Sequence, residues 1–365
     1  MKQNYSLPLL LSAFLTVLLF SCQSDNEDDY DEIITQIESP VVMDLAQVPY
    51  PNLSDYHFFE GELKNLQPAS RVIPYDLNST LFTDYAKKKR FVWMPDGLKA
   101  TYAADGETLN FPVGTALLKT FYYDSTTDDD VPNIIETRVM IKKESGWMFA
   151  NYVWNQDKTE ATLNTMQQEV RVSWMHNGEE RMARYKIPAT ASCIMCHDLN
   201  DVATTIGTKP QNLNKQYNYA DGTENQLSKW MATGYLNTVP QNITSTVNWT
   251  DETQPLELRV RSYLDINCAH CHNPGAYCGY TPMNFQFGVT DLPQNLGVCN
   301  EPVDFVTSGQ EYIVDGQDIE NSLLHYRMNN NIQSEMMPPI GRSVVDEEAL
   351  QMIAEWISTM ETQCP

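Results

Sequence analysis

The chain has 365 residues, enough for two or three domains, and it carries 48 acidic against 24 basic side chains. The resulting formal net charge of −24 at pH 7 excludes a general basic surface for nucleic acid. The same charge disfavours binding to anionic membrane surfaces.

The first 22 residues predict export. Lys2 supplies a positive start, and the apolar run from Leu7 to Phe20 is too short and too poorly flanked to be a membrane span. The run ends in Leu19-Phe20-Ser21-Cys22, which resembles the lipobox of bacterial lipoproteins, where the cysteine is acylated and becomes the mature N-terminus. An ordinary signal peptide with an incidental cysteine is the alternative. We expect a signal peptide over residues 1–21 and lipidation at Cys22.

Residues 22–39 are acidic and nearly free of aliphatic side chains at their start, so we expect a solvated tether. An acidic stretch after a lipidated cysteine also resembles the surface-export signal of some Gram-negative lipoproteins, and a simple spacer is equally consistent. The expected location is therefore the cell envelope, as an outer membrane lipoprotein on the periplasmic face or the cell surface.

Residues 40–188 predict a β-rich domain. Turn signals such as Pro95-Asp96-Gly97 and Asn177-Gly178 separate segments that are rich in β-branched and aromatic residues. The expected strands are Arg90–Met94, Leu117–Tyr122, Thr137–Ile141 and Trp147–Trp154. This part contains no constellation of metal ligands or nucleophiles.

After residue 188 the apolar residues follow a helical period. The expected helices are Thr223–Tyr235, Pro255–Ile266, Asn321–Met328 and Asp346–Met360. In the last of these, Asp346 is a plausible N-cap, and Ile353 and Ile357 belong to the apolar stripe.

Two segments share the pattern C-x-x-C-H: Cys193-Ile194-Met195-Cys196-His197 and Cys268-Ala269-His270-Cys271-His272. This pattern attaches c-type haem. Two thiols three residues apart lie on one side of a helical turn, where both can form thioethers with the haem vinyl groups. The adjacent histidine then lies under the iron as an axial ligand.

The competing interpretations explain less of the two motifs. Zinc sites bring four ligands in recognisable pairs, which are missing nearby, and a disulfide or a thioredoxin-like motif leaves both histidines unexplained. We therefore expect two haem c groups, with His270 incidental. The covalent attachment residues are Cys193, Cys196, Cys268 and Cys271, and the axial ligands of the iron are His197 and His272.

A methionine loop follows the second motif. Met337-Pro338-Pro339 comes 65 residues after His272, and its prolines hold the loop stiff and extended. With the helix before Cys268 and the Asp346 helix after the loop, this order resembles a class I cytochrome c domain over residues 251–365. Met337, not Met336, is then the expected distal ligand, and a core-filling Met337 is the alternative.

The distal ligand of the first haem, in residues 189–250, is less well specified. Met231 is the single methionine between His197 and Cys268, and no histidine lies there. A buried core position on the helix of Leu227 explains Met231 equally well. His57 or His176 could come from the β-rich domain instead, or the site could be open.

Besides Cys22, three cysteines lie outside these motifs, and an exported chain favours one disulfide among them. Cys278 and Cys299 both lie between the second motif and the methionine loop, so we expect this pair and an unpaired Cys364.

Over its mature length the chain resembles a family of di-haem c-type cytochromes that is found beside a parallel β-helix partner protein in Gram-negative bacteria. The C-terminal pieces are the more specific. The matching pieces are Asp84-Tyr85-Ala86, Lys89-Arg90, Phe111 to Thr115, the Cys193 motif, Leu213-Asn214, Asn225-Gln226-Leu227, Tyr263 to Pro274, Tyr326-Arg327-Met328, Met337-Pro338-Pro339 and Glu355-Trp356-Ile357. The resemblance implies haem binding and electron transfer, and it names no substrate.

The expected protein is multidomain, with an N-terminal β-rich domain followed by an α-helical cytochrome c-like di-haem region. We expect a lipid-anchored electron carrier that passes electrons between redox proteins, and haem propionates would make its charge still more negative, so a partner with a basic docking surface is expected. The alternatives are a haem enzyme, peroxidase-like or oxidase-like, with an open first haem, or a docking module carried by the β-rich domain.

Overall fold

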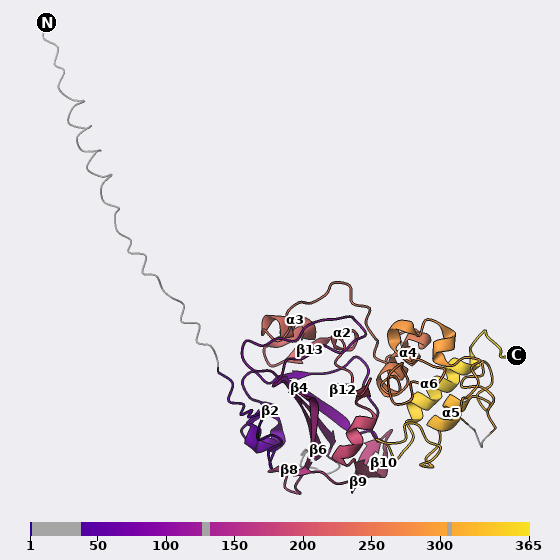
Figure 1. The fold of residues 1–365 in the computed structure, drawn as a ribbon, viewed down its shortest axis with the longest axis horizontal. Helices are drawn as coiled ribbons and strands as arrows, with labels where there is room; N and C mark the ends of the chain where they lie inside the picture. The colour runs from indigo at the N-terminus through magenta and orange to yellow at the C-terminus, as the bar shows by residue number, and fades with distance from the viewer. Residues whose placement is uncertain (2–37, 126–131, 305–308) are drawn as a thin grey trace. The chain divides into compact units, whose positions relative to one another are not determined.

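The main sheet of the protein has six antiparallel strands in the order β3-β4-β5-β6-β7-β8 (Figure 1). The structure is a computed structural model that describes residues 1, 38–125, 132–304 and 309–365. The signal peptide, Cys22 and most of the acidic tether lie outside these residues. The strands are β3 (Ile73–Tyr75), β4 (Lys87–Trp93), β5 (Ala116–Tyr123), β6 (Asn133–Lys143), β7 (Gly146–Trp154) and β8 (Ala161–Asn164).

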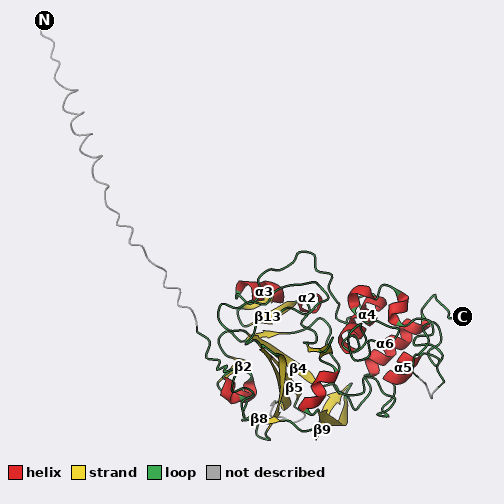
Figure 2. Cartoon of the chain, viewed as in Figure 1, coloured by secondary structure: helices red, strands yellow, loops and turns green. Residues whose placement is uncertain are grey.

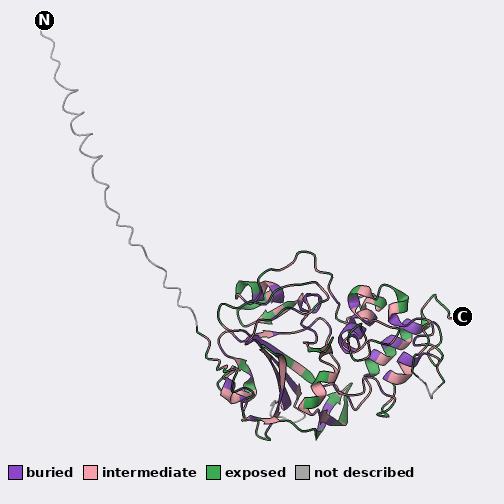
Figure 3. Ribbon diagram, viewed as in Figure 1, coloured by how far each residue is buried: buried purple, intermediate pink, exposed green. Residues whose placement is uncertain are grey.

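Successive side chains of a strand point to opposite faces of the sheet. Because β5 and β6 contain runs of consecutive buried residues, both faces of this sheet are largely buried (Figure 3). On one face Phe91, Leu118 and Val139 lie opposite one another on neighbouring strands and belong to one hydrophobic cluster. On the other face Val92 and Leu117 join a second cluster that includes residues of α2 to α4. The four predicted strands are confirmed as β4, β5, β6 and β7.

Short two-stranded sheets surround the main one. They are β1 (Phe59–Glu60) with β2 (Gln67–Pro68), β9 (Gln168–His176) with β10 (Glu179–Ile187), β11 (Asp198–Leu199) with β12 (Val202–Ala203), and β13 (Gln216–Tyr219) with β14 (Gly222–Asn225). Asn177 and Gly178 connect β9 to β10 and both have positive φ, as the two-residue turn of a hairpin requires.

The helices are short (Figure 2). The α-helices are α2 (Pro210–Leu213), α3 (Gln226–Ala232), α4 (Leu256–Asn267), α5 (Leu323–Met328) and α6 (Glu347–Ser358). The 3₁₀ helices are η2 (Ser54–Tyr56), η3 (Leu63–Asn65), η4 (Thr190–Met195), η5 (Phe287–Val289) and η6 (Pro293–Leu296). No helix among the described residues has the length and apolar character needed to cross a membrane.

The predicted α-helical, cytochrome c-like region is wrong. The structure is mostly β-sheet, with 27% strand and 19% helix, and several of its sheets are small. Helices do form near the four predicted places, but most of residues 189–365 lies in loops and in the hairpins β11–β12 and β13–β14. Asn, Asp, Gly and Pro are frequent between the helices, and their turn preferences stop each helix after a few turns.

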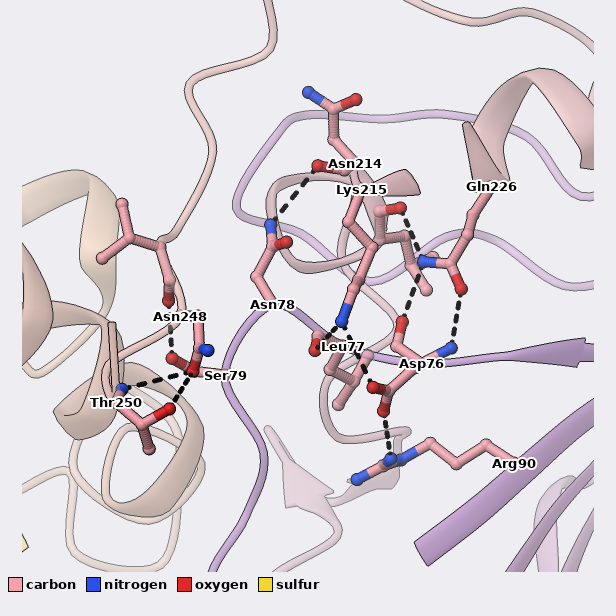
Figure 4. A network of polar contacts seen from close by, with 12 residues as sticks. Asp76, Leu77, Asn78, Ser79, Arg90, Asn214, Lys215, Gln226, Asn248 and Thr250 are labelled. Carbon is pink, nitrogen blue, oxygen red and sulfur yellow. Dashed lines mark hydrogen bonds and ion pairs between the residues drawn. The ribbon is translucent and has the colours of Figure 1, made fainter. Parts of the chain in front are cut away.

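Polar networks join the later segments to the main sheet. The Asp76 carboxylate after β3 accepts hydrogen bonds from Arg90 (2.6 Å) and from Lys215 (3.2 Å), as Figure 4 shows. The Gln226 side chain accepts from the Asp76 N–H and donates to the Asp76 carbonyl. The Asp84 carboxylate likewise accepts the N–H groups of Ser343 (2.6 Å) and Val344 (3.0 Å) before α6. These bonds hold β3 and β4 against segments that are distant in the sequence.

The predicted disulfide between Cys278 and Cys299 is wrong, because Cys299 pairs with Cys364. A parallel bridge between Val298 and Val314 holds Cys299, and the chain end returns to the same place. The Cys278 N–H donates to the Cys271 carbonyl, which keeps Cys278 at the second motif instead. Sequence proximity favoured the shorter loop, whereas tertiary folding decided the pairing.

Replacing Cys299 with Ser should therefore lower the free energy of unfolding by about 4 kcal/mol, because the disulfide closes a loop with a sequence separation of 65. Urea unfolding measures the loss. Cys278→Ser is the matched control, with an expected change within about 0.5 kcal/mol. Peptide mapping that finds Cys278 joined to Cys299 would contradict the pairing.

Asp346 makes the stability depend on pH. Its Oδ1 accepts from the Ala349 N–H as the N-cap of α6, and burial raises the pKa of Asp346 to about 6. The native state thus holds this proton more tightly than the unfolded chain, and the stability present below pH 4 falls by about 2–3 kcal/mol as the pH rises through 6.

Asp346→Asn keeps a capping oxygen and does not titrate, so we expect it to be more stable than the wild type at pH 7, with a difference that shrinks toward pH 4. Urea unfolding at four pH values from 4 to 7 tests this. Glu347→Gln, on the next and exposed residue, is the control. An Asp346→Asn curve parallel to that of the wild type would disprove the assignment.

Candidate functional site

The two C-x-x-C-H motifs fold into the same hydrogen-bonded turn. In the first motif, at the end of η4, the N–H groups of Cys196 and His197 donate to the Cys193 carbonyl, at 3.2 and 3.0 Å. In the second, after α4, the N–H groups of Cys271 and His272 donate to the Cys268 carbonyl, at 3.1 and 3.0 Å. All four cysteines are free thiols. Each turn therefore presents two thiols and one imidazole together, as the spacing predicts.

Both motif histidines have one nitrogen held by the protein. His197 Nδ1 bonds to the Thr204 carbonyl at 2.8 Å, and His272 Nδ1 bonds to Thr281 Oγ1 at 3.1 Å. The Thr281 hydroxyl donates to the Cys278 carbonyl, so it accepts the proton of His272. This arrangement leaves each Nε2 with its lone pair, which is the form that binds a metal.

Burial keeps these imidazoles neutral at pH 7. Desolvation and, to a smaller extent, the charge of Lys119 lower the pKa of His197 to about 3. Desolvation also lowers the pKa of His272 to about 4. The rings pack against Phe149 and Phe285, with centroid distances of 5.1 and 5.7 Å. Both histidines are therefore preorganised as neutral ligands.

Each motif opens on its own cavity. The first cavity, beside His197, is bounded by the motif thiols and by side chains of β5, β6 and β7, and the second cavity lies beside His272 and Cys268. The enclosed parts of the two cavities measure about 120 and 130 Å³, and both continue into space that is open to solvent. Binding sites for drug-sized ligands span about 300–1,000 Å³, so a large flat group would occupy the enclosed part of each cavity together with the open space beside it.

The two motifs touch each other. The Sγ atoms of Cys196 and Cys271 and a ring nitrogen of His270 all lie within 4.8 Å of one another. Cys271 Sγ also approaches the Met195 carbonyl at 3.8 Å. The thiol of Cys271 hydrogen-bonds to Cys196, which lowers the pKa of Cys196 to about 5 and raises that of Cys271.

A close backbone approach supports this contact. The Asn200 N–H, just after the first motif, donates to the Gly275 carbonyl after the second at 2.8 Å. Gly275 has a φ of +86°, and a Cβ there would lie 2.2 Å from Asn200 Oδ1. Only glycine fits this position. The Pro274-Gly275 pair is the sequence signal for the approach, although nothing in the sequence identifies its partner.

The structure brings Met337 to the second cavity. Met337 lines that cavity together with His272, and the Met337 N–H donates to the Arg327 carbonyl at 3.0 Å. Met336 is 3% exposed, and it does not line either motif cavity. The side chain of Met337 thus has access to the space in front of His272.

The structure does not place Met231, predicted as a distal ligand, at the first cavity. Its side chain is 48% exposed on α3, while Leu227 and Trp230 of the same helix face the core, and it does not line the first cavity. His57 and His176 do not line it either, and His176 pairs with Glu348 at 2.9 Å. The helical pattern of the sequence alone could not show whether Met231 is exposed or buried.

Sequence reasoning missed several residues of the first cavity. His270, taken as incidental, lines it with a buried Nδ1 that has no hydrogen-bond partner among the described residues. Met140, Lys119 and Arg138 line it from the main sheet. The alternation of side chains along β5 and β6 indicated which residues share a face of the sheet. It could not show that the first motif covers that face.

These residues fit a covalently attached haem. Two free thiols and a neutral imidazole with an available Nε2 lie at the edge of the first largely apolar cavity, Cys268 and His272 lie at the edge of the second, and Cys271 lies at the contact with Cys196. These are the donors that such a group needs. Searches of protein-family models, of curated proteins and of solved structures find no match for this chain. The functional assignment therefore depends on the site itself.

Proposed function

We propose that the protein is a di-haem c-type cytochrome that passes electrons between redox proteins in the cell envelope. Cys193 and Cys196 would attach one haem, with His197 as its axial ligand. Cys268 and Cys271 would attach the other, with His272 as its axial ligand. When bound, each haem supplies an iron that takes up and releases one electron between its ferric and ferrous states.

The contact between the motifs carries this proposal. The Sγ atoms of Cys196 and Cys271 lie within 4.8 Å of each other. In a c-type haem the thioether sulfurs are bonded at the periphery of the ring. Two haems attached through these neighbouring sulfurs would be held near each other within one chain. Such a pair suits passage of a single electron from a reduced protein donor to an oxidised protein acceptor.

The chain's own residues prepare the sites for this task. Thr204 and Thr281 orient the imidazoles, so that little rearrangement is needed when the iron changes charge. Apolar side chains such as Phe149 and Phe285 limit the access of water to the histidines. A structure that changes little on electron uptake favours transfer over chemistry on an organic substrate.

The expected anchor and partner complete the proposal. Acylation of Cys22 would hold the protein at the outer membrane. The net charge of −24 favours a partner whose docking surface is basic. Electrostatic attraction of this kind mainly raises the rate of encounter and falls with ionic strength.

A second candidate function has one observation in its favour. Cys196, His270 and Cys271 offer three donors within 4.8 Å, a set that a zinc ion could use with a water as fourth ligand. The two functions exclude each other, because thioether formation consumes both thiols. Metal analysis of the purified protein therefore separates them.

The first test counts the bound groups. We expect two haems and two irons per chain, no zinc, and pigment that stays with the denatured protein. Replacing Cys193 and Cys196 with Ala should halve the haem-to-protein ratio, because the second motif is left intact. A wild-type ratio near one, or one bound zinc, would contradict the proposal.

The second test concerns the distal ligand in the second cavity. Met337→Leu should remove the methionine–iron charge-transfer band of one haem and lower its reduction potential, because a thioether ligand stabilises the ferrous iron. Optical spectra and a redox titration measure both effects. Met336→Leu is the control, since both changes conserve volume and should each cost less than about 1.5 kcal/mol. A spectral loss in the Met336 variant instead would place the ligand one residue earlier.

A further inference from the structure

A row of basic side chains crosses the face of the main sheet that bounds the first cavity. In the strand register Arg90 on β4 lies opposite Lys119 on β5, Lys119 lies opposite Arg138 on β6, and Arg138 lies opposite Asn151 on β7. Directly opposite residues point to the same face. Lys119, Arg138 and Asn151 also line the cavity that the first motif borders.

This arrangement is costly without an anion, because like charges directly opposite each other on neighbouring strands destabilise a sheet. Arg90 pairs with Asp76 at 2.6 Å, and Arg138 pairs with the buried Glu136 at 2.5 Å. Lys119 has no hydrogen bond or ion pair among the described residues, and it lies over the ring of Phe121 at 5.8 Å.

Arg138 and one further cation, Lys88, approach the same ring. Arg138 lies 4.5 Å from the Phe121 centroid, and Lys88 lies 5.8 Å from it, also without an ion-pair partner in the described parts of the chain. The Nε atoms of Arg90 and Arg138 are buried and unpartnered. Lys88 and Lys119 thus have no carboxylate partner among the described residues, and burial beside other cations lowers the pKa of both lysines.

We propose that Lys119 and Arg138 bind the propionate carboxylates of the haem attached at Cys193 and Cys196. The inference rests on the proposed function, and it assigns a polar end to the first cavity. A haem carries two carboxylates that must be neutralised when its ring is buried. Burial and the neighbouring Arg90 and Arg138 lower the pKa of Lys119 to about 7, so a carboxylate beside it would favour its charged form. The planar guanidinium of Arg138 suits a carboxylate.

The other polar side chain of the row supports this orientation. Asn151 is 1% exposed, and its amide donates to the Pro188 carbonyl at 2.9 Å just before η4. The cationic row is therefore tied to the segment that leads into the first motif. The thiols, His197 and the cations thus surround one space, where a single group can engage all of them.

The test uses the full-length holoprotein with Lys119→Gln, and Lys89→Gln as its matched control. Lys89 is the neighbouring residue before Arg90, is exposed, and points to the opposite face of β4. Removing the Lys119 charge should lower the reduction potential of the first haem, because a nearby cation favours the ferrous iron. It should also shift the propionate bending modes in the resonance Raman spectrum, while Lys119→Arg should restore the potential.

Arg138→Lys is the second variant, because it keeps the charge beside Glu136 but loses the planar fork, and it should shift the propionate modes with little change in potential. The inference would be overturned if Lys119→Gln and Arg138→Lys bind two haems per chain and leave both the reduction potential and the propionate modes unchanged. That result would leave the proposed function intact. A wild-type chain with fewer than two haems would instead refute the proposed function. A wild-type potential that depends on added phosphate at constant ionic strength would assign the site to a free anion and also overturn the inference.

Discussion

The contact between the two cysteine motifs organises the site. Cys196 and Cys271 come together because Asn200 and Gly275 allow the two segments to approach at backbone distance. A Cβ at position 275 would clash with the Asn200 side chain and would strain a backbone with a φ of +86°, which would disturb this approach. With the contact in place, two groups of ligands that lie about 75 residues apart in the sequence form one continuous site. The proposed function as a relay, rather than as two isolated centres, would depend on this approach.

The main sheet supplies the other half of the first cavity. Its strands bury one face in a hydrophobic cluster around Leu118, and they present Lys119, Arg138 and Asn151 on the other. A polar row on a largely buried sheet reduces stability unless something compensates for its charge. The β-rich part of the chain is thus a wall of the site that determines where a charged group can lie, and this gives it a role other than docking.

Local features of this fold were predictable from sequence, and long-range features were not. Strands β4 to β7, the Asp346 cap and the turns of both motifs follow from residue preferences over a few positions. The prediction of a cytochrome c-like helical region failed because short stretches of helical periodicity do not predict the loops and small sheets between them. The Cys299–Cys364 disulfide, the exposure of Met231 and the proximity of His270 to Cys196 depend on tertiary contacts. No spacing rule encodes these contacts.

Electron paramagnetic resonance of the fully oxidised protein tests the central claim, that two haems lie close enough to exchange electrons within one chain. The spectrum of the wild type is compared with those of two single-haem variants, Cys193→Ala/Cys196→Ala and Cys268→Ala/Cys271→Ala. Because neighbouring ferric ions couple magnetically, we expect a wild-type spectrum that differs from the sum of the two variants in line width and position. A wild-type spectrum equal to that sum would show two isolated centres and contradict the account.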